Sequence, residues 1–520
     1  MSTEPRETPV SGQNVARQGG VVAAMTLISR VAGVARDIAL AGVLGASGLA
    51  DAFLVAFRIP NFFRRLFAEG AFNQAFVPVL MRYREQGALE LTRFVGVMGG
   101  NLAVVLGIVV VLGVLFAPAV TMVFAPGFVG TGRFELTASL LRITFPYLGF
   151  ISLASFAGAV LNAHHRYAAA AFTPVLLNLC LLLAVAVSLL TGGSAVVTLA
   201  WGVLVAGLVQ LLFLLAPLRG IGMLLPPAPN LAHPGARQVG RLLIPAVLAA
   251  SVSQINALID SVLASTLMVG SVSWLYYADR LLELPIGMVA VALATVLLPN
   301  LSRLDARGET QKFQQTLDWG LGLALALAIP AAVALGMLAE PLIATIFQRG
   351  RMQILDVRMT AAALQLFAVG LTPMVLVKVL APAYFAREDT RTPFRIGIAS
   401  VATNIVISLL VFRWFGHVGL ALAMSAAACV NAGLLLRGLV RSGAYVPGST
   451  LVRMLGRVVP ATLAMAVVLW VVTPAAEAWL TAGGLWRAGW LLIVVVAGGG
   501  AYSLCLWLLG LRPADFLHRL

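Results

Sequence analysis

Long apolar runs separated by short polar connections set the pattern of this chain. About 20 apolar residues in helical form cross the hydrocarbon core of a bilayer. This criterion predicts fourteen membrane spans. Their expected ranges are 20–45, 51–80, 93–123, 134–162, 168–191, 195–217, 239–267, 271–301, 313–346, 357–385, 393–413, 417–437, 453–473 and 486–510. The longest connection, 218–238, is rich in proline and glycine, which predicts a non-helical hinge.

The composition agrees with a chain that lies mostly in lipid. Of 520 residues, 60% are apolar and 11% charged, and the mean hydropathy is +0.97, whereas soluble proteins are about 25% charged. A soluble enzyme, a nucleic-acid-binding domain and a disordered scaffold are therefore excluded. The net charge of +15 is typical of basic residues that collect on the cytoplasmic side of membrane spans. Most arginines fall on that side when both termini are placed in the cytoplasm, so we expect that topology.

An internal repeat divides the chain. The segments FRIPNFF and FVPVL match LELPIGM and LLPNL, so that Pro60 and Pro78 correspond to Pro285 and Pro299. Six predicted spans separate the copies, and an even number preserves orientation, so the repeat is parallel. The predicted fold is an all-α integral membrane protein with two six-helix lobes and a final helix pair. The expected parts are an N-terminal lobe (1–217), a cytoplasmic linker (218–238), a C-terminal lobe (239–440) and the pair (441–520).

Charged residues inside the predicted spans are the candidate functional residues, because charge at membrane depth is costly and usually functional. Those of the first two spans are Arg30, Arg36, Asp37, Asp51, Arg58, Arg64, Arg65 and Glu69, and those of the eighth are Asp279, Arg280 and Glu283. Arg65 and Glu69 stand at i,i+4, a pairing distance, and Arg58 shares their face. We expect these charges, with Asp37, Asp279 and Glu283, to act mainly as structural or gating charges.

Four arginines are left least satisfied by helical spacing: Arg30, Arg36, Arg64 and Arg280. Arginines in a cavity suit a pyrophosphate, because guanidinium groups bind phosphate oxygens in forks. We therefore predict that these four converge on one anion-binding cavity. The alternative is that they form structural ion pairs or reach the lipid headgroups. No cysteine or histidine pattern of a metal site is present, and we expect no catalytic residue.

Three segments carry a resemblance to a known family. They are SRVAGVARDIALAGVLGASGLADAFLVAFRIPNFFRRLFAEGAFNQAFVPVL (29–80), SVSWLYYADRLLELPIGMVAVALATVLLPNLSR (271–303) and VKVLAPAYFAREDTRTP (377–393). They resemble the MurJ, or MviN, family of lipid II flippases, in the multidrug/oligosaccharidyl-lipid/polysaccharide exporter superfamily. The resemblance implies fourteen helices and a transporter, not an enzyme, that carries the undecaprenyl-pyrophosphate-linked peptidoglycan precursor to the outer leaflet.

The resemblance also implies roles for particular residues. Arg30, Arg36, Arg64, Arg280 and Asp51 match the family's substrate-binding positions. Asp260 and Asn404 are weak candidates for a sodium site, because Ser408 stands where a second acid is expected. The final pair is expected to line a groove for the lipid tail. No cofactor is implied; monovalent-ion coupling or the membrane potential is the expected energy source.

The expected setting is the bacterial inner membrane, with lipid II and membrane lipids as partners, no nucleic acid, a monomeric state and contacts with the cell-wall synthesis machinery. Three other functions stay open or are weaker. A polysaccharide-repeat lipid flippase also handles a pyrophosphate. A multidrug exporter of the same superfamily should have an acidic cavity, against the arginine excess here. A membrane glycosyltransferase needs catalytic acids in a sizeable loop, which the chain does not offer.

Overall fold

The computed structural model describes residues 12–65 and 72–511. All regular elements within these residues are helices. Helices satisfy their own backbone hydrogen bonds, which lipid cannot supply, so apolar runs of this length fold as helices. The described helices belong to two compact units, each with its own internal packing. Unit 1 comprises residues 1–43, 52–124 and 129–254, and unit 2 comprises 44–51, 125–128 and 255–520.

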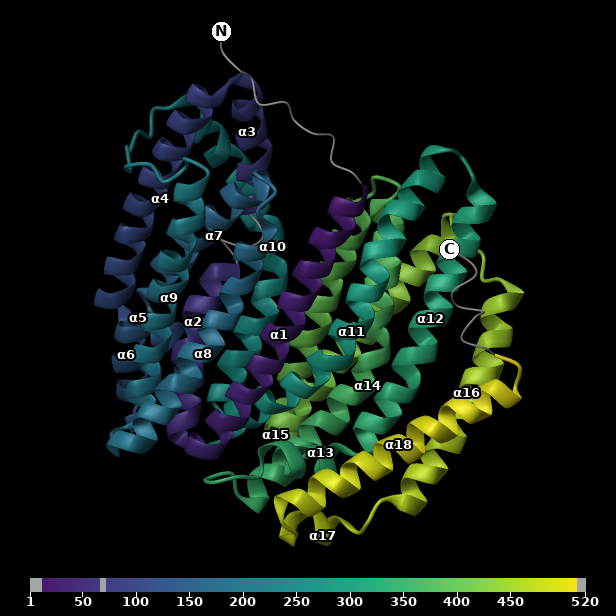
Figure 1. The fold of residues 1–520 in the computed structure, drawn as a ribbon. Helices are drawn as coiled ribbons and strands as arrows, with labels where there is room; N and C mark the ends of the chain where they lie inside the picture. The colour runs from purple at the N-terminus through teal and green to yellow at the C-terminus, as the bar shows by residue number, and fades with distance from the viewer. Residues whose placement is uncertain (1–11, 66–71, 512–520) are drawn as a thin grey trace. The chain divides into compact units, whose positions relative to one another are not determined.

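Unit 1 holds the first nine helices. They are α1 (Gly12–Leu44), α2 (Gly48–Phe63), α3 (Phe72–Gln86), α4 (Ala88–Leu115), α5 (Ala117–Phe124), α6 (Gly132–Thr144), α7 (Tyr147–Ala163), α8 (Tyr167–Thr191) and α9 (Ala195–Gly220). Within the unit, α9 packs against α7 and α8, and α4 packs against α3 and α7 (Figure 1). The helix α10 (Pro234–Ser265) begins in unit 1 and ends in unit 2.

Unit 2 continues with the remaining helices. They are α11 (Ser271–Ala306), α12 (Thr310–Met337), α13 (Ala339–Phe347), α14 (Ile354–Phe385), α15 (Arg391–Arg441), α16 (Ser449–Val472), α17 (Ala476–Thr481) and α18 (Gly484–Leu508), together with the 3-10 turn η2 (Pro126–Phe128). Helix α14 is the centre of the packing, because it contacts α11, α12, α13 and α15. A long helix surrounded by others in this way forms the unit's core.

Each of the fourteen predicted ranges is helical over most of its described residues, but 93–123, 134–162 and 313–346 are each divided into two helices by turn residues, at 116, 145–146 and 338. Nine helices of the described part are long and apolar enough to cross a membrane, so the chain is a multi-pass membrane protein. One of these nine is α15, which covers two predicted spans and changes direction at Gly416, where φ is 57°. Glycine adopts this left-handed conformation without steric cost, so a single residue can separate two helical segments there. The count of fourteen membrane crossings itself stays a prediction.

The two copies of the repeat differ in continuity. Pro285 and Pro299 both lie inside the single long helix α11. Pro60 lies inside α2 and Pro78 inside α3, two separate helices. The first copy is four residues longer between its prolines, in the stretch that contains Arg64, Arg65 and Glu69. Residues 66–71 of this stretch lie outside the described residues; Arg64 and Arg65 directly after α2 are π-helical, a feature frequent at functional sites.

The predicted linker is non-helical from residue 221 to 233, as expected, but it is attached to unit 1 as a strap over α4. The Ala228 amide donates to the Gly96 carbonyl at 3.2 Å. Asn101 forms a two-way bridge with the backbone of Asn230, at 2.7 and 3.0 Å. Gly100 permits this approach, because a Cβ there would lie 2.7 Å from the backbone nitrogen of Pro229. The prolines therefore mark a fixed, extended segment and not a free hinge.

The final helices attach to unit 2 through a small apolar cluster. Leu338, Met465, Leu469 and Val494 are buried together, and α16 packs against both α12 and α18. In Figure 1 the yellow α18 runs beside the yellow-green α16. The opposite faces of this pair expose large apolar side chains such as Leu463, Val467 and Leu492, which suits contact with lipid tails.

Candidate functional site

A buried charge network in unit 1 is the first part of the candidate site. Arg36 and Asp37 are 5% and 2% exposed. The Arg36 guanidinium donates from Nε and Nη2 to Asp37 Oδ1, at 3.0 and 2.7 Å. Its Nη1 donates to Asn178 Oδ1 on α8 at 2.9 Å, and Asn178 Nδ2 donates in turn to the Ser29 carbonyl at 3.0 Å. One arginine thus joins two helices through a carboxylate and an amide.

This network corrects one expectation about pairing. Arg36 was expected to lack an acid, yet it pairs with Asp37. Neighbouring side chains on a helix point about 100° apart, so spacing does not pair them. The arginine side chain is long enough to bend round the helix to the short Asp37, so the adjacent residue becomes its partner. Arg30 is half-buried and makes no side-chain hydrogen bond or ion pair with a described residue.

Tyr147 brings a second arginine to the same part of unit 1. This tyrosine, at the beginning of α7, is 1% exposed. It interacts electrostatically with both Arg64 and Arg36. Arg64 is half-buried at the end of α2, where its Nε donates to Asn61 Oδ1 at 3.1 Å. Two of the four predicted arginines therefore lie near one buried phenol.

The two other described arginines of this region, Arg58 and Arg65, differ in exposure. Arg58 is half-buried and Arg65 is exposed. The predicted Arg65–Glu69 pair cannot be placed, because Glu69 lies outside the described residues. The expected structural role of these residues stays a prediction.

Asp51 holds a helix end in unit 2. It is fully buried, and its Oδ2 accepts a hydrogen bond from the Gly270 amide at 2.7 Å. Its Oδ1 accepts from the Ser273 amide at 3.0 Å and from the Ser273 hydroxyl at 2.7 Å. A carboxylate at this position accepts hydrogen bonds from the first N–H groups of α11 and interacts favourably with the positive end of the helix dipole. The geometry gives Asp51 a structural contact; its predicted role in substrate binding stays a prediction.

Arg280 lies near the beginning of α11 in a more open environment. Its Nη1 pairs with Glu283 Oε2 at 2.8 Å, with 30% of the arginine side chain and 48% of the glutamate side chain exposed. The guanidinium carbon lies 5.0 Å from the centre of the Tyr276 ring, a cation–π distance. Arg280 thus has the i+3 partner that its spacing offered, while neighbouring Asp279 is half-buried. Its predicted convergence with the arginines of unit 1 stays a prediction.

The weak sodium candidates meet in unit 2. The Asn404 amide donates to Asp260 Oδ1 at 3.1 Å and to Asn256 Oδ1 at 3.2 Å. Asn404 and Ser408 are fully buried, and within the described residues Asn404 Oδ1 and Ser408 Oγ have no hydrogen-bond partner. Hard cations prefer oxygen ligands, but Asp260 Oδ1 and Asn256 Oδ1 accept from the Asn404 amide here, so a sodium site at these residues stays a prediction. Asn256 was not among the predicted residues.

Sequence reasoning missed Asn178 and Tyr147. A signal for Asn178 was available, because it is the one amide in the apolar run of 168–191. Tyr147 had no comparable signal, since a tyrosine in an apolar helix is ordinarily part of the core. Its position relative to Arg36 and Arg64 depends on packing between helices distant in sequence.

Comparisons with known proteins show which family has this sequence. The family model described as lipid II flippase MurJ matches residues 40–488. The probable lipid II flippase MurJ of Vibrio cholerae is 43% identical, over 96% of this chain and 97% of its own length. The lipid II flippase MurJ of Burkholderia cenocepacia is 38% identical, over 96% of this chain and 98% of its own.

Solved structures agree. A lipid II flippase MurJ in the inward closed conformation is 25% identical, with a TM-score of 0.79 over 93% of this chain and 98% of that chain. An inward-facing MATE multidrug transporter of the MOP superfamily shares the fold, with 15% identity and a TM-score of 0.66 over 82% of this chain and 98% of that chain. The extent of the family match and the identity to its members settle the assignment: the chain belongs to the MurJ family of lipid II flippases.

Proposed function

We propose that the chain translocates lipid II, the undecaprenyl-pyrophosphate-linked peptidoglycan precursor, from the inner to the outer leaflet for cell-wall synthesis. Like its relatives, which are lipid II flippases, it is a transporter and not an enzyme. The observation that carries the proposal, beside the family match, is the placement of Arg36 and Arg64 near one buried phenol in unit 1. An organic-cation exporter would need an acidic site in the same fold.

The chemistry of the proposed site follows from the arginines. A pyrophosphate carries several oxygens, and guanidinium groups bind such oxygens in pairs, which lysine cannot do. We propose that Arg36, Arg64 and Arg280 bind the pyrophosphate, and that Arg30 attracts it. Lipid II then moves by alternating access, with its isoprenoid tail along the apolar face of α16 and α18.

We propose that transport is driven by a monovalent cation or by the membrane potential. The half-buried carboxylate of Asp260 and the buried, unpartnered oxygens of Asn404 and Ser408 within the described residues support binding of a monovalent cation. A membrane potential would also act on a charged site, at about 2.3 kcal/mol per elementary charge per 100 mV. We further propose a monomer in the bacterial inner membrane, working beside the cell-wall synthesis machinery, with both termini in the cytoplasm.

Depletion of the protein in its host tests the proposed substrate. We expect lipid II to accumulate in the inner leaflet while other undecaprenyl-linked glycolipids still cross. Selective retention of a polysaccharide repeat unit, with normal lipid II transport, would replace lipid II by that substrate and favour the alternative function.

A further inference from the structure

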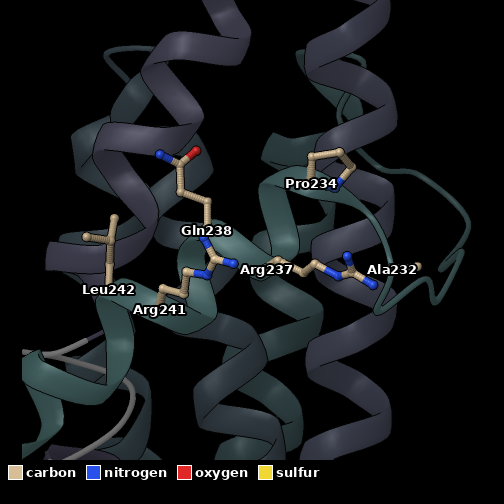
Figure 2. A pocket seen from close by; sticks show the side chains of 6 residues that line it. All are labelled: Ala232, Pro234, Arg237, Gln238, Arg241 and Leu242. Carbon is tan, nitrogen blue, oxygen red and sulfur yellow. The ribbon is translucent and has the colours of Figure 1, made fainter.

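A surface pocket of about 500 Å³ opens at the beginning of α10 in unit 1 (Figure 2). Its lining residues are Ala232, Pro234, Arg237, Gln238, Arg241 and Leu242. None of them takes part in the charge network around Arg36 or in the proposed transport of the pyrophosphate. The pocket therefore needs an explanation of its own.

The pocket carries positive charge that no described side chain neutralises. Arg237 and Arg241 stand at i,i+4 on α10, so they share one face of the helix. Both are exposed, and neither has an ion pair or side-chain hydrogen bond within residues 12–65 and 72–511. In unit 2, by contrast, the exposed Lys312 is paired with Glu309 at 2.5 Å.

A third arginine is held at the pocket by Gln238. In the amide orientation that satisfies its hydrogen bonds, the Gln238 oxygen accepts from both Nη1 and Nη2 of Arg82 on α3, at 2.9 and 2.8 Å. This fork fixes the arginine without removing its charge. Two guanidinium groups thus line the pocket and a third lies against its Gln238, and no carboxylate of the described residues is paired with any of the three.

The pocket is built on a fixed base. Its rim includes Ala232, at the end of the strap of residues 221–233, which the Asn101–Asn230 bridge holds on α4. His233 is buried, with its ring 5.8 Å from the ring of Tyr83 and 6.1 Å from that of Phe94. The first turn of α10 is consequently positioned before any ligand arrives, which lowers the entropic cost of binding.

The surroundings change from charged to apolar along α10. Leu242 is 41% exposed and Ile244 is 66% exposed, directly after the arginines in the helix. On the strap side, Leu231 is 70% exposed. Basic side chains followed by lipid-facing apolar ones match a phospholipid, whose phosphate lies at the interface and whose acyl chains lie deeper. A free phosphate would have no use for the apolar flank.

We propose that this pocket binds the headgroup of an anionic phospholipid, with Arg237 and Arg241 on the phosphate and the acyl chains along Leu242 and Ile244. The site would fix the beginning of α10 to the cytoplasmic leaflet. It differs from the proposed transport site in its residues, and its occupant is a resident lipid and not the cargo.

The test measures phospholipid binding by the full-length protein in detergent. The protein is titrated with phosphatidylglycerol or phosphatidylcholine, and bound lipid is counted by native mass spectrometry. We expect a preference for phosphatidylglycerol. A basic side chain near an anionic headgroup contributes roughly fivefold in affinity, so the Arg237→Ala, Arg241→Ala double variant should bind it about 30-fold more weakly.

Matched variants separate a defined site from general surface charge. Arg219→Ala removes an exposed arginine at the end of α9, outside the pocket, and should leave the affinity unchanged. The Arg237→Lys, Arg241→Lys variant retains the charge and should keep most of the binding, which also shows that the fold tolerates change there. Equal loss in Arg219→Ala, or unchanged affinity in the double alanine variant, would overturn the proposal. Competition by millimolar inorganic phosphate would point to a soluble anion and also overturn it.

Discussion

Arg36 in unit 1 and Arg280 in unit 2 look alike in the sequence but have different surroundings. Arg36 is buried, with a buried carboxylate and the amide of Asn178 as partners. Arg280 is partly exposed, with an exposed glutamate and an aromatic ring beside it. The comparison teaches that Arg36 belongs to a buried structural network, whereas the ion pair of Arg280 with Glu283 is partly exposed, so that its loss should cost little stability. Substitutions at the two sites should therefore fail in different ways.

The largest expected effect is on transport. Arg280→Ala should abolish transport of lipid II while the protein remains at normal abundance, because the ion pair that it removes is partly exposed and contributes little stability. Arg36→Ala should abolish transport and also lower abundance. Lipid II translocation and membrane abundance are measured together in a depleted host. Arg280→Lys is the control for charge without the guanidinium fork and should be impaired. Normal transport by Arg280→Ala would remove this residue from the proposed site.

A large effect on stability is expected from Asp37→Ala. It leaves the buried guanidinium of Arg36 without its carboxylate, and breaking a buried ion pair costs about 3–5 kcal/mol. Thermal unfolding in detergent should show a clear fall in the midpoint. An unchanged midpoint would mean that water reaches Arg36. The contrast between the buried pair of Arg36 and the partly exposed pair of Arg280 would then disappear.

A smaller loss is expected from Asn178→Leu, which keeps the side chain's approximate size. It removes the acceptor for Arg36 Nη1, and a hydrogen bond to a charged group contributes about 1.5–3 kcal/mol. The same unfolding measurement applies. Asn178→Asp keeps an acceptor and adds a charge beside Arg36, so it should retain more stability than the leucine variant; the reverse order would contradict the observed donor and acceptor assignment.

The smallest effect is expected from Glu283→Gln in unit 2. Exposed ion pairs contribute about 0–1 kcal/mol, and glutamine can still accept a hydrogen bond from Arg280. The unfolding midpoint should stay close to that of the unaltered protein. A fall as large as that of Asp37→Ala would show that Arg280 is as dependent on its acid as Arg36.

The sequence predicted the helices far better than the partners of the charges. Apolar runs specify helices locally, so the predicted ranges are mostly helical where the chain is described, although short turns at 116, 145–146 and 338 were not predicted. The partner of Arg36 on α8 is 142 positions away, which spacing along one helix cannot show. Asp51 was assigned to substrate binding by resemblance. Of the three hydrogen bonds described above for its carboxylate, two come from backbone amides, and a sequence pattern does not reveal contacts with the backbone.

The strap over α4 shows a related limit. Its proline and glycine content correctly predicted the absence of helix, but mobility depends on what the segment contacts. The contacts are made by Gly96, Gly100 and Asn101 inside an apolar helix. In the sequence these residues resemble the small or polar residues that ordinarily interrupt a membrane span.

The strap also has a practical consequence for anyone who cuts or tags this protein. A protease must draw out an extended stretch of chain into its active site, and residues 221–233 can be drawn out only after the bonds of Ala228 and Asn230 to α4 are broken. The amides of these two residues should exchange with deuterium slowly, although they belong to no helix. A tag inserted in this connection should lower the yield of folded protein, although its composition resembles that of a permissive loop.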